Sequence, residues 1–218
     1  MQNSSTWRLR RLTVMAMLTA LSYTAVFFVR IPVVLFLSYE PKDVLLTIGA
    51  FLFGPMAGAC MAVVVALLEM VTFSTTGAIG LAMNVISSCL FVCTASLIYH
   101  RKRTLAGAVI GLVCGALLTT GGMVLWNYLI TPLYMTVSRS EIAGMLLPVF
   151  APFNLLKGSI NAALTMLLYK TVSSALRAAR LLPPAEAASK KSRIPVWLIT
   201  LFVLATLVLI LLSWKGII

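Results

Sequence analysis

Long runs of apolar residues, broken only by short polar or basic segments, dominate this chain of 218 residues. Hydrophobic residues make up 61% of the sequence and charged residues 10%, whereas a soluble domain carries about 25% charged residues. The apolar runs are continuous rather than alternating, which is typical of membrane-spanning helices and not of the strands of a membrane β-barrel. The sequence therefore predicts an all-α integral membrane protein.

Seven apolar runs can be followed along the chain. We expect the first six to form a bundle of helices over residues 12–29, 44–53, 56–71, 81–99, 106–130 and 145–172. We expect the seventh, residues 194–212, to be an extra C-terminal transmembrane helix. The predicted organisation is a cytoplasmic N-terminus (1–11), a six-helix membrane domain (12–175), a basic cytoplasmic linker (176–193) and the C-terminal helix segment (194–218).

The polar N-terminal residues include three arginines ahead of the first apolar run. A basic segment before an apolar run is also typical of a signal peptide. No A-x-A cleavage site follows, and further spans do, so we favour a retained first helix.

The distribution of basic residues predicts the orientation in the membrane. When the N-terminus is placed in the cytoplasm, twelve of the seventeen Lys and Arg residues fall on the cytoplasmic side and four on the outer side. This bias follows the positive-inside rule. We therefore expect a multi-pass protein of the cell (plasma) membrane with its C-terminus outside. The net charge of +12 is explained by the same rule, so we expect the lipid bilayer, and no nucleic acid, as a partner.

One basic residue, Lys157, lies within a predicted span and has no acid nearby in the sequence. Asn154, Lys157 and Asn161 are spaced i, i+3 and i+7, so they share one face of a helix. A charge inside a membrane helix costs at least ~2.5 kcal/mol on insertion scales, and such residues usually face a polar cavity. The alternative is a lysine that snorkels to the membrane interface. The two asparagines on the same face favour a ligand site.

The predicted topology brings most polar side chains of the spans to the outer half of the membrane. Glu69 ends the third helix, Asn84 begins the fourth, and Asn127 ends the fifth. A cavity open to the outside explains this distribution; the alternative is chance combined with the ordinary polarity of helix ends. We expect Glu69, the acid placed within a span, to pair with Lys157 when the site is empty, with water as the alternative partner.

Residues 30–43 connect the first two predicted helices and contain two prolines and four charged residues. They also carry apolar side chains at Val33, Leu35 and Phe36, so the segment can pack onto the protein without forming a helix. We expect an irregular loop that covers the site as a lid. Asp43 is expected to cap the helix that follows.

Several short motifs resemble a known family. Residues 39–43 (Tyr-Glu-Pro-Lys-Asp) and then 53–55 (Phe-Gly-Pro) resemble the first-loop and second-helix pattern of S components, the substrate-binding membrane subunits of energy-coupling-factor (ECF) vitamin transporters. Four further motifs resemble those of the riboflavin-specific members. They are residues 69–72 (Glu-Met-x-Thr), 76–84 (Thr-Gly-Ala-Ile-Gly-x-x-x-Asn), 126–127 (Trp-Asn) and 153–158 (Phe-Asn-Leu-Leu-Lys-Gly). The resemblance covers about residues 10–175, and the motifs agree in order and spacing with the predicted topology.

The resemblance implies a six-helix S-component bundle that binds riboflavin tightly from outside and carries out no chemistry. Riboflavin would be a transported ligand, so no catalytic residues, cofactor or metal are expected. The expected substrate-binding residues are Lys157, Asn154, Asn127, Asn84, Glu69, Tyr39, Thr76 and Gly77. Three of these, Asn127, Asn154 and Lys157, match positions expected to hydrogen-bond the flavin, since amides and a lysine supply donors as well as acceptors.

The resemblance also implies partners. Ala16 and Ala20 match the alanine motif by which S components meet the shared transmembrane subunit EcfT, and small residues four apart allow close helix contact. Two ATP-binding subunits would drive that module, because this chain has no G-x-x-x-x-G-K-[ST] loop of its own. The seventh apolar run departs from the six-helix pattern of the family.

The sequence also admits three other interpretations. The first is an S component for thiamine, folate or a related compound, because the amides and the lysine of the outer half do not by themselves distinguish one vitamin from another. An intramembrane hydrolase needs a nucleophile with a base, or a set of metal ligands, within the spans; the sole histidine, His100, lies beside a basic cluster at a helix end. A structural membrane subunit without a ligand would show no stabilisation by a vitamin.

Overall fold

A computed structural model describes residues 4–34, 37–72, 76–135, 137–183 and 205. The C-terminal span expected over residues 194–212 lies, apart from residue 205, outside these described residues. The prediction of a seventh helix therefore stays a prediction.

All six predicted bundle helices are present. They are α1 (Ser4–Phe28), α2 (Lys42–Phe53), α3 (Pro55–Thr72), α4 (Gly77–Arg101), α5 (Leu105–Leu129) and α8 (Ala151–Ala178). Shorter helical elements join α5 to α8, namely α6 (Thr131–Tyr134), α7 (Arg139–Met145) and a π-helical turn (Leu146–Phe150). The expected all-α membrane fold is confirmed, because five helical segments within the described part of the chain are long and apolar enough to span a bilayer.

Helix α2 lies at the centre of the bundle. It packs against α1, α3, α4 and α8, and nine of its twelve residues are buried. A helix that is apolar on every side is a buried helix, and the sequence of α2 has that character after Asp43. Its twelve residues extend about 18 Å at 1.5 Å per residue, which is shorter than the ~30 Å hydrocarbon core. Lys42 and Asp43 at its start are each 2% exposed, so the start of α2 lies inside the protein.

Glycines allow α5 to approach α4 closely, as its glycine-rich sequence suggested. A Cβ atom on Gly111 would lie 2.6 Å from the carbonyl oxygen of Ala95, and one on Gly115 would lie 2.8 Å from that of Phe91. Both distances are too short for a real Cβ contact. The two backbones meet at these positions because no side chain separates them.

Two helix boundaries differ from the predictions. Helix α1 begins at Ser4 rather than at residue 12, because no helix-breaking residue separates the polar start from the apolar run. The segment before α8, expected as a polar loop over residues 131–144, is helical over Thr131–Tyr134 and again from Arg139 onward. Its start carries a capping box, in which Ser138 Oγ accepts from the Glu141 N–H at 3.3 Å and Glu141 Oε2 accepts from the Ser138 N–H at 2.9 Å.

The π-helical turn explains why the sixth predicted helix, residues 145–172, is not a regular α-helix from its first residue. Pro148 and Pro152 have no N–H to donate, so the regular i to i−4 hydrogen-bond pattern is interrupted at both positions. A π-turn accommodates such an interruption within a continuous helical path. At the other end, α8 continues to Ala178, three residues beyond the predicted limit of the membrane domain.

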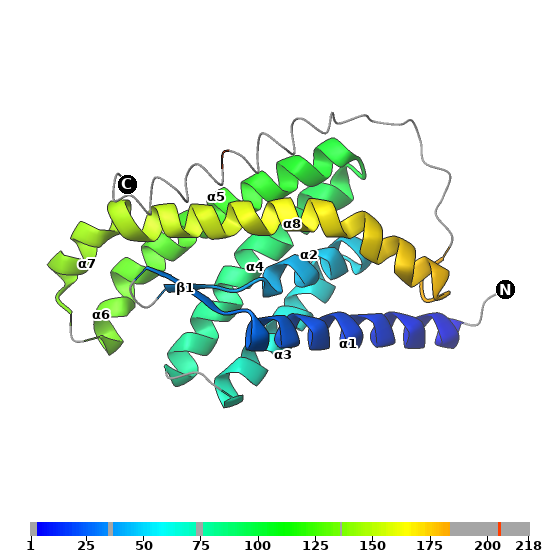
Figure 1. Ribbon diagram of the computed structural model, residues 1–218, viewed down its shortest axis with the longest axis horizontal. Coiled ribbons are helices and arrows are strands. Elements are labelled where there is room, and N and C mark those ends of the chain that lie inside the picture. The colour runs from blue at the N-terminus through cyan, green and yellow to red at the C-terminus, as the bar shows by residue number, and fades with distance from the viewer. Residues whose placement is uncertain (1–3, 35–36, 73–75, 136, 184–204, 206–218) are drawn as a thin grey trace.

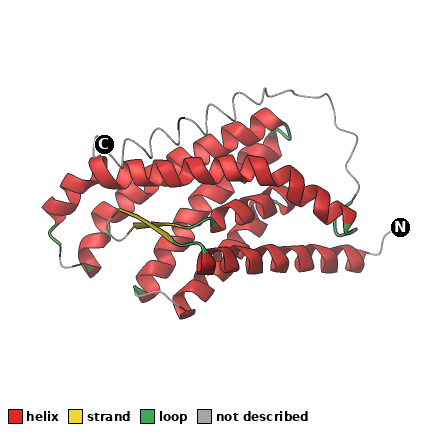
Figure 2. Ribbon diagram, in the orientation of Figure 1, coloured by secondary structure: helices red, strands yellow, loops and turns green. Residues whose placement is uncertain are grey.

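The expected irregular lid is a β-hairpin. Strands β1 (Ile31–Val34) and β2 (Leu37–Tyr39) pair antiparallel, with Ile31 opposite Tyr39. Figure 2 shows these two strands against the otherwise helical fold. In Figure 1 the hairpin points toward the end of the molecule where α6 and α7 lie, away from the N-terminus. Leu35 and Phe36, two of its expected apolar anchors, lie outside the described residues.

The two ends of the bundle differ in charge. The opposite end from the hairpin contains the start of α1 and the end of α2, which are joined by a hydrogen bond from Arg11 Nη2 to the Phe53 carbonyl oxygen at 3.3 Å. The basic cluster at residues 101–103 begins at the last residue of α4, whose C-terminal part contacts that of α8 through the hydroxyls of Tyr99 and Tyr169, 3.2 Å apart. Basic residues thus gather at one end of the bundle, and the polar residues predicted to form a site gather at the other.

Candidate ligand-binding site

A cavity of about 380 Å³ opens at the hairpin end of the bundle. Its wall is built from Arg30 between α1 and the hairpin, from β2 and the residue after it, from the ends of α3 and α5, from α6, and from the starts of α4 and α8. The volume falls in the range of small-molecule sites, about 300–1,000 Å³. The topology places these helix ends together because consecutive helices run in alternating directions.

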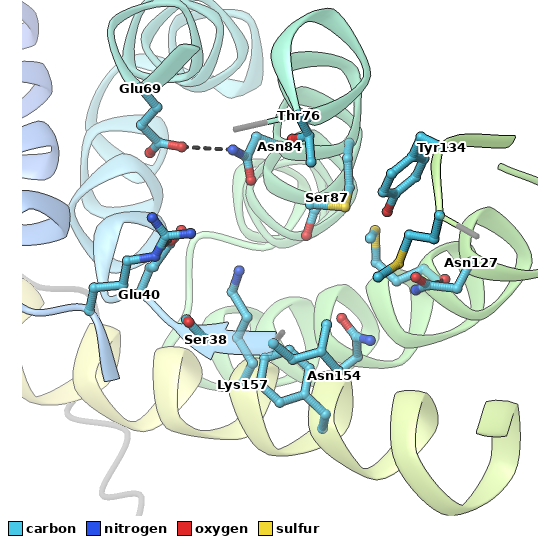
Figure 3. A pocket seen from close by; sticks show the side chains of 17 residues that line it. Ser38, Glu40, Glu69, Thr76, Asn84, Ser87, Asn127, Tyr134, Asn154 and Lys157 are labelled. Carbon is cyan, nitrogen blue, oxygen red and sulfur yellow. Dashed lines mark hydrogen bonds and ion pairs between the residues drawn. The ribbon is translucent and has the colours of Figure 1, made fainter. Parts of the chain in front are cut away.

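Six of the eight predicted substrate-binding residues line this cavity. They are Lys157, Asn154, Asn127, Asn84, Glu69 and Thr76. Figure 3 shows Lys157 and Asn154 extending from α8 into the cavity, with Glu69 and Asn84 across from them and Asn127 to one side. The other two, Tyr39 and Gly77, are not among the lining residues.

Tyr39 is part of the structure that supports the cavity. Its hydroxyl donates to Asn161 Oδ1 at 3.0 Å, and the residue is 8% exposed. Burial, and then the negative charge of Asp43, raise the pKa of Tyr39 above its ordinary value. The hydroxyl therefore stays protonated at neutral pH and remains a donor to Asn161. Gly77 begins α4 with φ +55°, a conformation that favours glycine.

Lys157 does not snorkel to a surface. Its side chain is 13% exposed, and its Nζ lies 4.0 Å from Asp43 Oδ2. The predicted pairing of Lys157 with Glu69 is wrong, because the start of α2 places Lys42 next to Glu69 instead. Lys42 was expected in an outer loop, and for that reason it was not predicted as the cation that neutralises Glu69.

Lys42 forms the most buried ion-pair network of the site. Its Nζ lies 2.6 Å from both carboxylate oxygens of Glu69 and 3.3 Å from Glu40 Oε2, and its side chain is 2% exposed. Glu40 Oε1 in turn lies 3.3 Å from Arg30 Nε at the cavity mouth. The network joins the hairpin to α2 and α3. A buried carboxylate is tolerated when a cation or hydrogen bonds compensate for its lost hydration, and here a cation does so.

Burial alone would raise the pKa of Glu40, but the neighbouring cations Lys42, Lys157 and Arg30 outweigh burial and hold this pKa below its ordinary value. Glu40 is therefore ionised at neutral pH. Its charge contributes stability above the ordinary carboxyl pKa, and that contribution is lost as the pH falls through the lowered value.

The asparagines of the cavity are fixed by hydrogen bonds within the protein. Asn84 Nδ2 donates to Glu69 Oε2 at 2.7 Å, Asn127 Nδ2 to the Met123 carbonyl at 2.7 Å, and Asn154 Nδ2 to the Phe150 carbonyl at 2.8 Å. Each of these bonds uses one N–H of an amide that has two N–H donors and an oxygen acceptor. The amides are thus held in place and retain further capacity to bind a ligand.

The charges around the cavity balance. Three cations, Arg30, Lys42 and Lys157, are matched by three anions. These anions are Glu40, Asp43 and Glu69, each within 4.0 Å of one of the cations. A site with no net charge favours a neutral polar ligand over a strongly charged one.

Apolar and aromatic side chains complete the lining, including Met83, Met123, Met135, Tyr134 and Phe153. Thioether and aromatic groups pack well on flat ring systems. The described residues contain no group of three or more His, Cys, Asp or Glu side chains that could hold a metal ion. The arrangement is suited to binding a neutral ligand with a polar edge and an apolar face.

The residues missed by sequence analysis cluster at the start of α2. Asp43 was expected to cap this helix, but its side chain makes no cap hydrogen bond there and instead contacts α4 and α8. One signal could have found the cluster. Because α2 is apolar on every face after its first two residues, the charged residues at its start had to be buried with it and paired there.

Comparisons with known proteins agree with this geometry. Residues 10–169 match the model of the family described as ECF transporter, substrate-specific component. A Riboflavin transporter RibU of Staphylococcus aureus (strain TCH60) is 29% identical over 177 residues, which cover 77% of this chain and 93% of the relative. A Riboflavin transporter RibU of Streptococcus thermophilus (strain ATCC BAA-250 / LMG 18311) is 30% identical over 178 residues, which cover 77% of this chain and 84% of the relative.

A solved structure described as the S component of a bacterial ECF transporter has a similar fold. It superposes with a TM-score of 0.65 at 28% sequence identity. The match covers 78% of this chain and 99% of the solved chain.

Proposed function

Since the chain belongs to the family of ECF transporter substrate-specific components, we propose that it binds riboflavin for import across the cell membrane. The single observation that carries the proposal is the charge-balanced cavity in which Lys157, Asn154 and Asn127 meet at one end of the bundle. Two relatives at 29% and 30% identity are riboflavin transporters. Binding and release involve no bond making, so transport needs no catalytic residue in this chain.

The chemistry of riboflavin fits the lining. The isoalloxazine ring is neutral and flat, and its edge carries carbonyl oxygens and ring nitrogens. Lys157 supplies N–H donors, and the asparagines supply both donors and acceptors. The methionine and aromatic side chains supply the apolar contact for the faces of the ring.

We place the mouth of the cavity on the outer side of the membrane. The basic residues gather at the opposite end of the bundle, and the positive-inside rule assigns that end to the cytoplasm. The N-terminus is then cytoplasmic. A single further span over residues 194–212 would bring the C-terminus outside.

Thermal unfolding of the purified protein with a panel of vitamins tests the proposed ligand. A ligand that binds the folded state at 100 times its Kd stabilises that state by about 2.7 kcal/mol. We expect riboflavin to raise the unfolding temperature, and thiamine and folate to leave it unchanged. A rise with thiamine or folate alone would indicate an S component for another vitamin. No rise with any vitamin would indicate a structural subunit.

We further propose that α1 meets the transmembrane subunit EcfT of a module driven by two ATP-binding subunits. Ala16 and Ala20 are both exposed on α1, and small residues four apart allow another helix to approach closely. Replacing both with tryptophan should block riboflavin uptake by cells and leave riboflavin binding by the purified protein intact.

The matched control for this pair is Leu118→Trp with Leu125→Trp, two positions on α5 that are 50% and 58% exposed. Uptake should survive these changes, since α5 is not the proposed contact surface. If the α1 variant loses binding while its assembly with EcfT persists, the alanines pack inside the protein and the interface is misplaced.

The hairpin is proposed to act as a lid over the bound vitamin. Leu37 and Ser38 of β2 line the cavity, and Glu40 directly after β2 also lines it. A ligand held against these residues should stabilise the closed hairpin, so riboflavin should slow proteolysis within residues 30–41. Thiamine serves as the control ligand. Equal cleavage rates with and without riboflavin would show that these residues do not act as a lid.

A further inference from the structure

Asp43 is a buried carboxylate near the cavity residue Lys157, and it is not itself one of the lining residues. Its side chain is 3% exposed. Asp43 Oδ1 accepts a hydrogen bond from Ser88 Oγ at 2.6 Å, and Asp43 Oδ2 accepts one from Asn161 Nδ2 at 3.4 Å. Its third partner is the ammonium of Lys157. One carboxylate thus links α2 to both α4 and α8.

The same contacts extend to the hairpin. Asn161, which donates to Asp43, accepts a hydrogen bond from the Tyr39 hydroxyl at 3.0 Å. Tyr39 is the last residue of β2. A continuous path therefore runs from the hairpin through Tyr39, Asn161 and Asp43 to Lys157.

We propose that Asp43 is a positioning residue, which holds the Lys157 ammonium at its place in the cavity and links that place to the closed hairpin through Asn161 and Tyr39. The inference rests on the proposed function, because its consequence is measured as riboflavin affinity. Asp43 itself touches no ligand in this proposal.

The geometry supports a role in orienting Lys157. A lysine side chain has a flexible four-carbon stem, so an unpaired ammonium would lose more freedom when a ligand fixes it. Asp43 is rigid because α2 is buried and two other groups bind the same carboxylate. The 4.0 Å separation is longer than a hydrogen bond. The contact therefore directs the ammonium without using its N–H donors.

The two neighbouring acids, Glu40 and Glu69, are held by other cations. Glu40 lies 3.3 Å from Lys42 Nζ and 3.3 Å from Arg30 Nε. Both oxygens of Glu69 lie 2.6 Å from Lys42 Nζ. In the part of the chain that the structure describes, Asp43 is the carboxylate within 4.0 Å of Lys157.

A double-mutant cycle tests the proposal. Asp43→Asn keeps the size of the side chain and its ability to bond Ser88, but removes the charge that faces Lys157. Riboflavin affinity is measured by the quenching of flavin fluorescence in four proteins: the parent, Asp43→Asn, Lys157→Met and the double variant. We expect Asp43→Asn to weaken binding about fivefold in the parent and less than about twofold in the Lys157→Met background, as for residues that act together.

Two results overturn the proposal. If Asp43→Asn weakens binding by the same factor in both backgrounds, the residue supports the fold in general and does not act through Lys157. If Asp43→Asn leaves the riboflavin affinity of the parent unchanged, the charge of Asp43 is not needed to position the Lys157 ammonium. Failure of the proposed function gives a different result, in which the parent protein itself binds no riboflavin. The failure of the role of Asp43 and the failure of the proposed function are therefore distinguishable.

A second variant keeps the test valid if Asp43→Asn does not fold. Tyr39→Phe removes one hydroxyl at the hairpin end of the path and leaves every charge in place. It should weaken riboflavin binding at least about twofold in the parent and not in the Lys157→Met background. Equal effects in both backgrounds overturn the link to the hairpin.

The control for both cycles is Ser96→Ala. Ser96 Oγ donates to the Ala50 carbonyl at 2.8 Å, so it also joins α4 to α2, but far from the cavity. Ser96→Ala should leave the affinity unchanged in both backgrounds. If Ser96→Ala weakens binding in the parent but not in the Lys157→Met background, as Asp43→Asn is expected to do, then any change between α2 and α4 affects riboflavin affinity through Lys157. That result would overturn the assignment to Asp43.

Discussion

Lys42→Met should lower the free energy of unfolding by about 3–5 kcal/mol, the cost of removing one partner from a buried ion pair. The ammonium lies 2.6 Å from both oxygens of Glu69 and 3.3 Å from Glu40. Without it, two carboxylates at most 9% exposed lose their shared cation. Denaturant titration of the protein in detergent micelles, followed by circular dichroism, measures the change.

Two variants serve as controls for Lys42→Met. Lys170→Met removes a lysine that is exposed on α8, and should change stability by less than about 0.5 kcal/mol. Combining Lys42→Met with Glu69→Leu should recover part of the loss, because replacing a whole buried pair with apolar residues is often neutral. If Lys42→Met costs no more than Lys170→Met, the ion-pair network does not stabilise the fold.

Lys157→Met should weaken riboflavin binding at least about 10-fold, or about 1.4 kcal/mol. The ammonium extends into the cavity, and methionine keeps the length of the side chain without its donors. Folding should survive, since Asp43 keeps its hydrogen bonds to Ser88 and Asn161 and a methionine is easier to bury than a lysine. Fluorescence titration measures the affinity, and circular dichroism checks the fold.

The exposed Lys170→Met is again the matched control and should bind riboflavin as the parent does. If Lys157→Met also binds as well as the parent, the ammonium makes no productive contact with the vitamin, and the ligand lies elsewhere in the cavity or the protein.

The helices were predictable because the physical constraint on them is strong. A backbone in lipid must satisfy its own hydrogen bonds, so continuous apolar runs become helices, and the alternating directions of the runs bring their polar ends together. Lys157, Asn154 and Asn127 could be placed in one site from run lengths and helical spacing alone. All three line the cavity.

The ion pairs were less predictable because they depend on how deep each charged side chain lies in the folded bundle. Glu69 had two candidate cations, and sequence position favoured Lys157 only because Lys42 was assigned to a loop outside the membrane. Lys42 is the first residue of α2 and is buried inside the protein. Its ammonium therefore lies next to Glu69. Tertiary depth, and not local pattern, decides that pairing.

The hairpin was missed for a related reason. Pro32 and the four charges of residues 30–43 argue against a regular strand, and alternation is too short to detect in strands of four and three residues. Tyr39 was assigned to the ligand for its place in a motif, yet its hydroxyl bonds to Asn161. A motif identifies a residue that matters to a site without showing which atom it touches.

Titration of riboflavin with the purified protein tests the central claim most directly. At a riboflavin concentration of about 1 μM, flavin fluorescence should fall as the protein is added and should reach a plateau at one riboflavin per chain, as expected for tight binding. Thiamine and folate in excess should not restore the fluorescence. Fluorescence that stays constant at these concentrations, or that thiamine or folate restores, would contradict the assignment of this chain as a riboflavin-specific subunit.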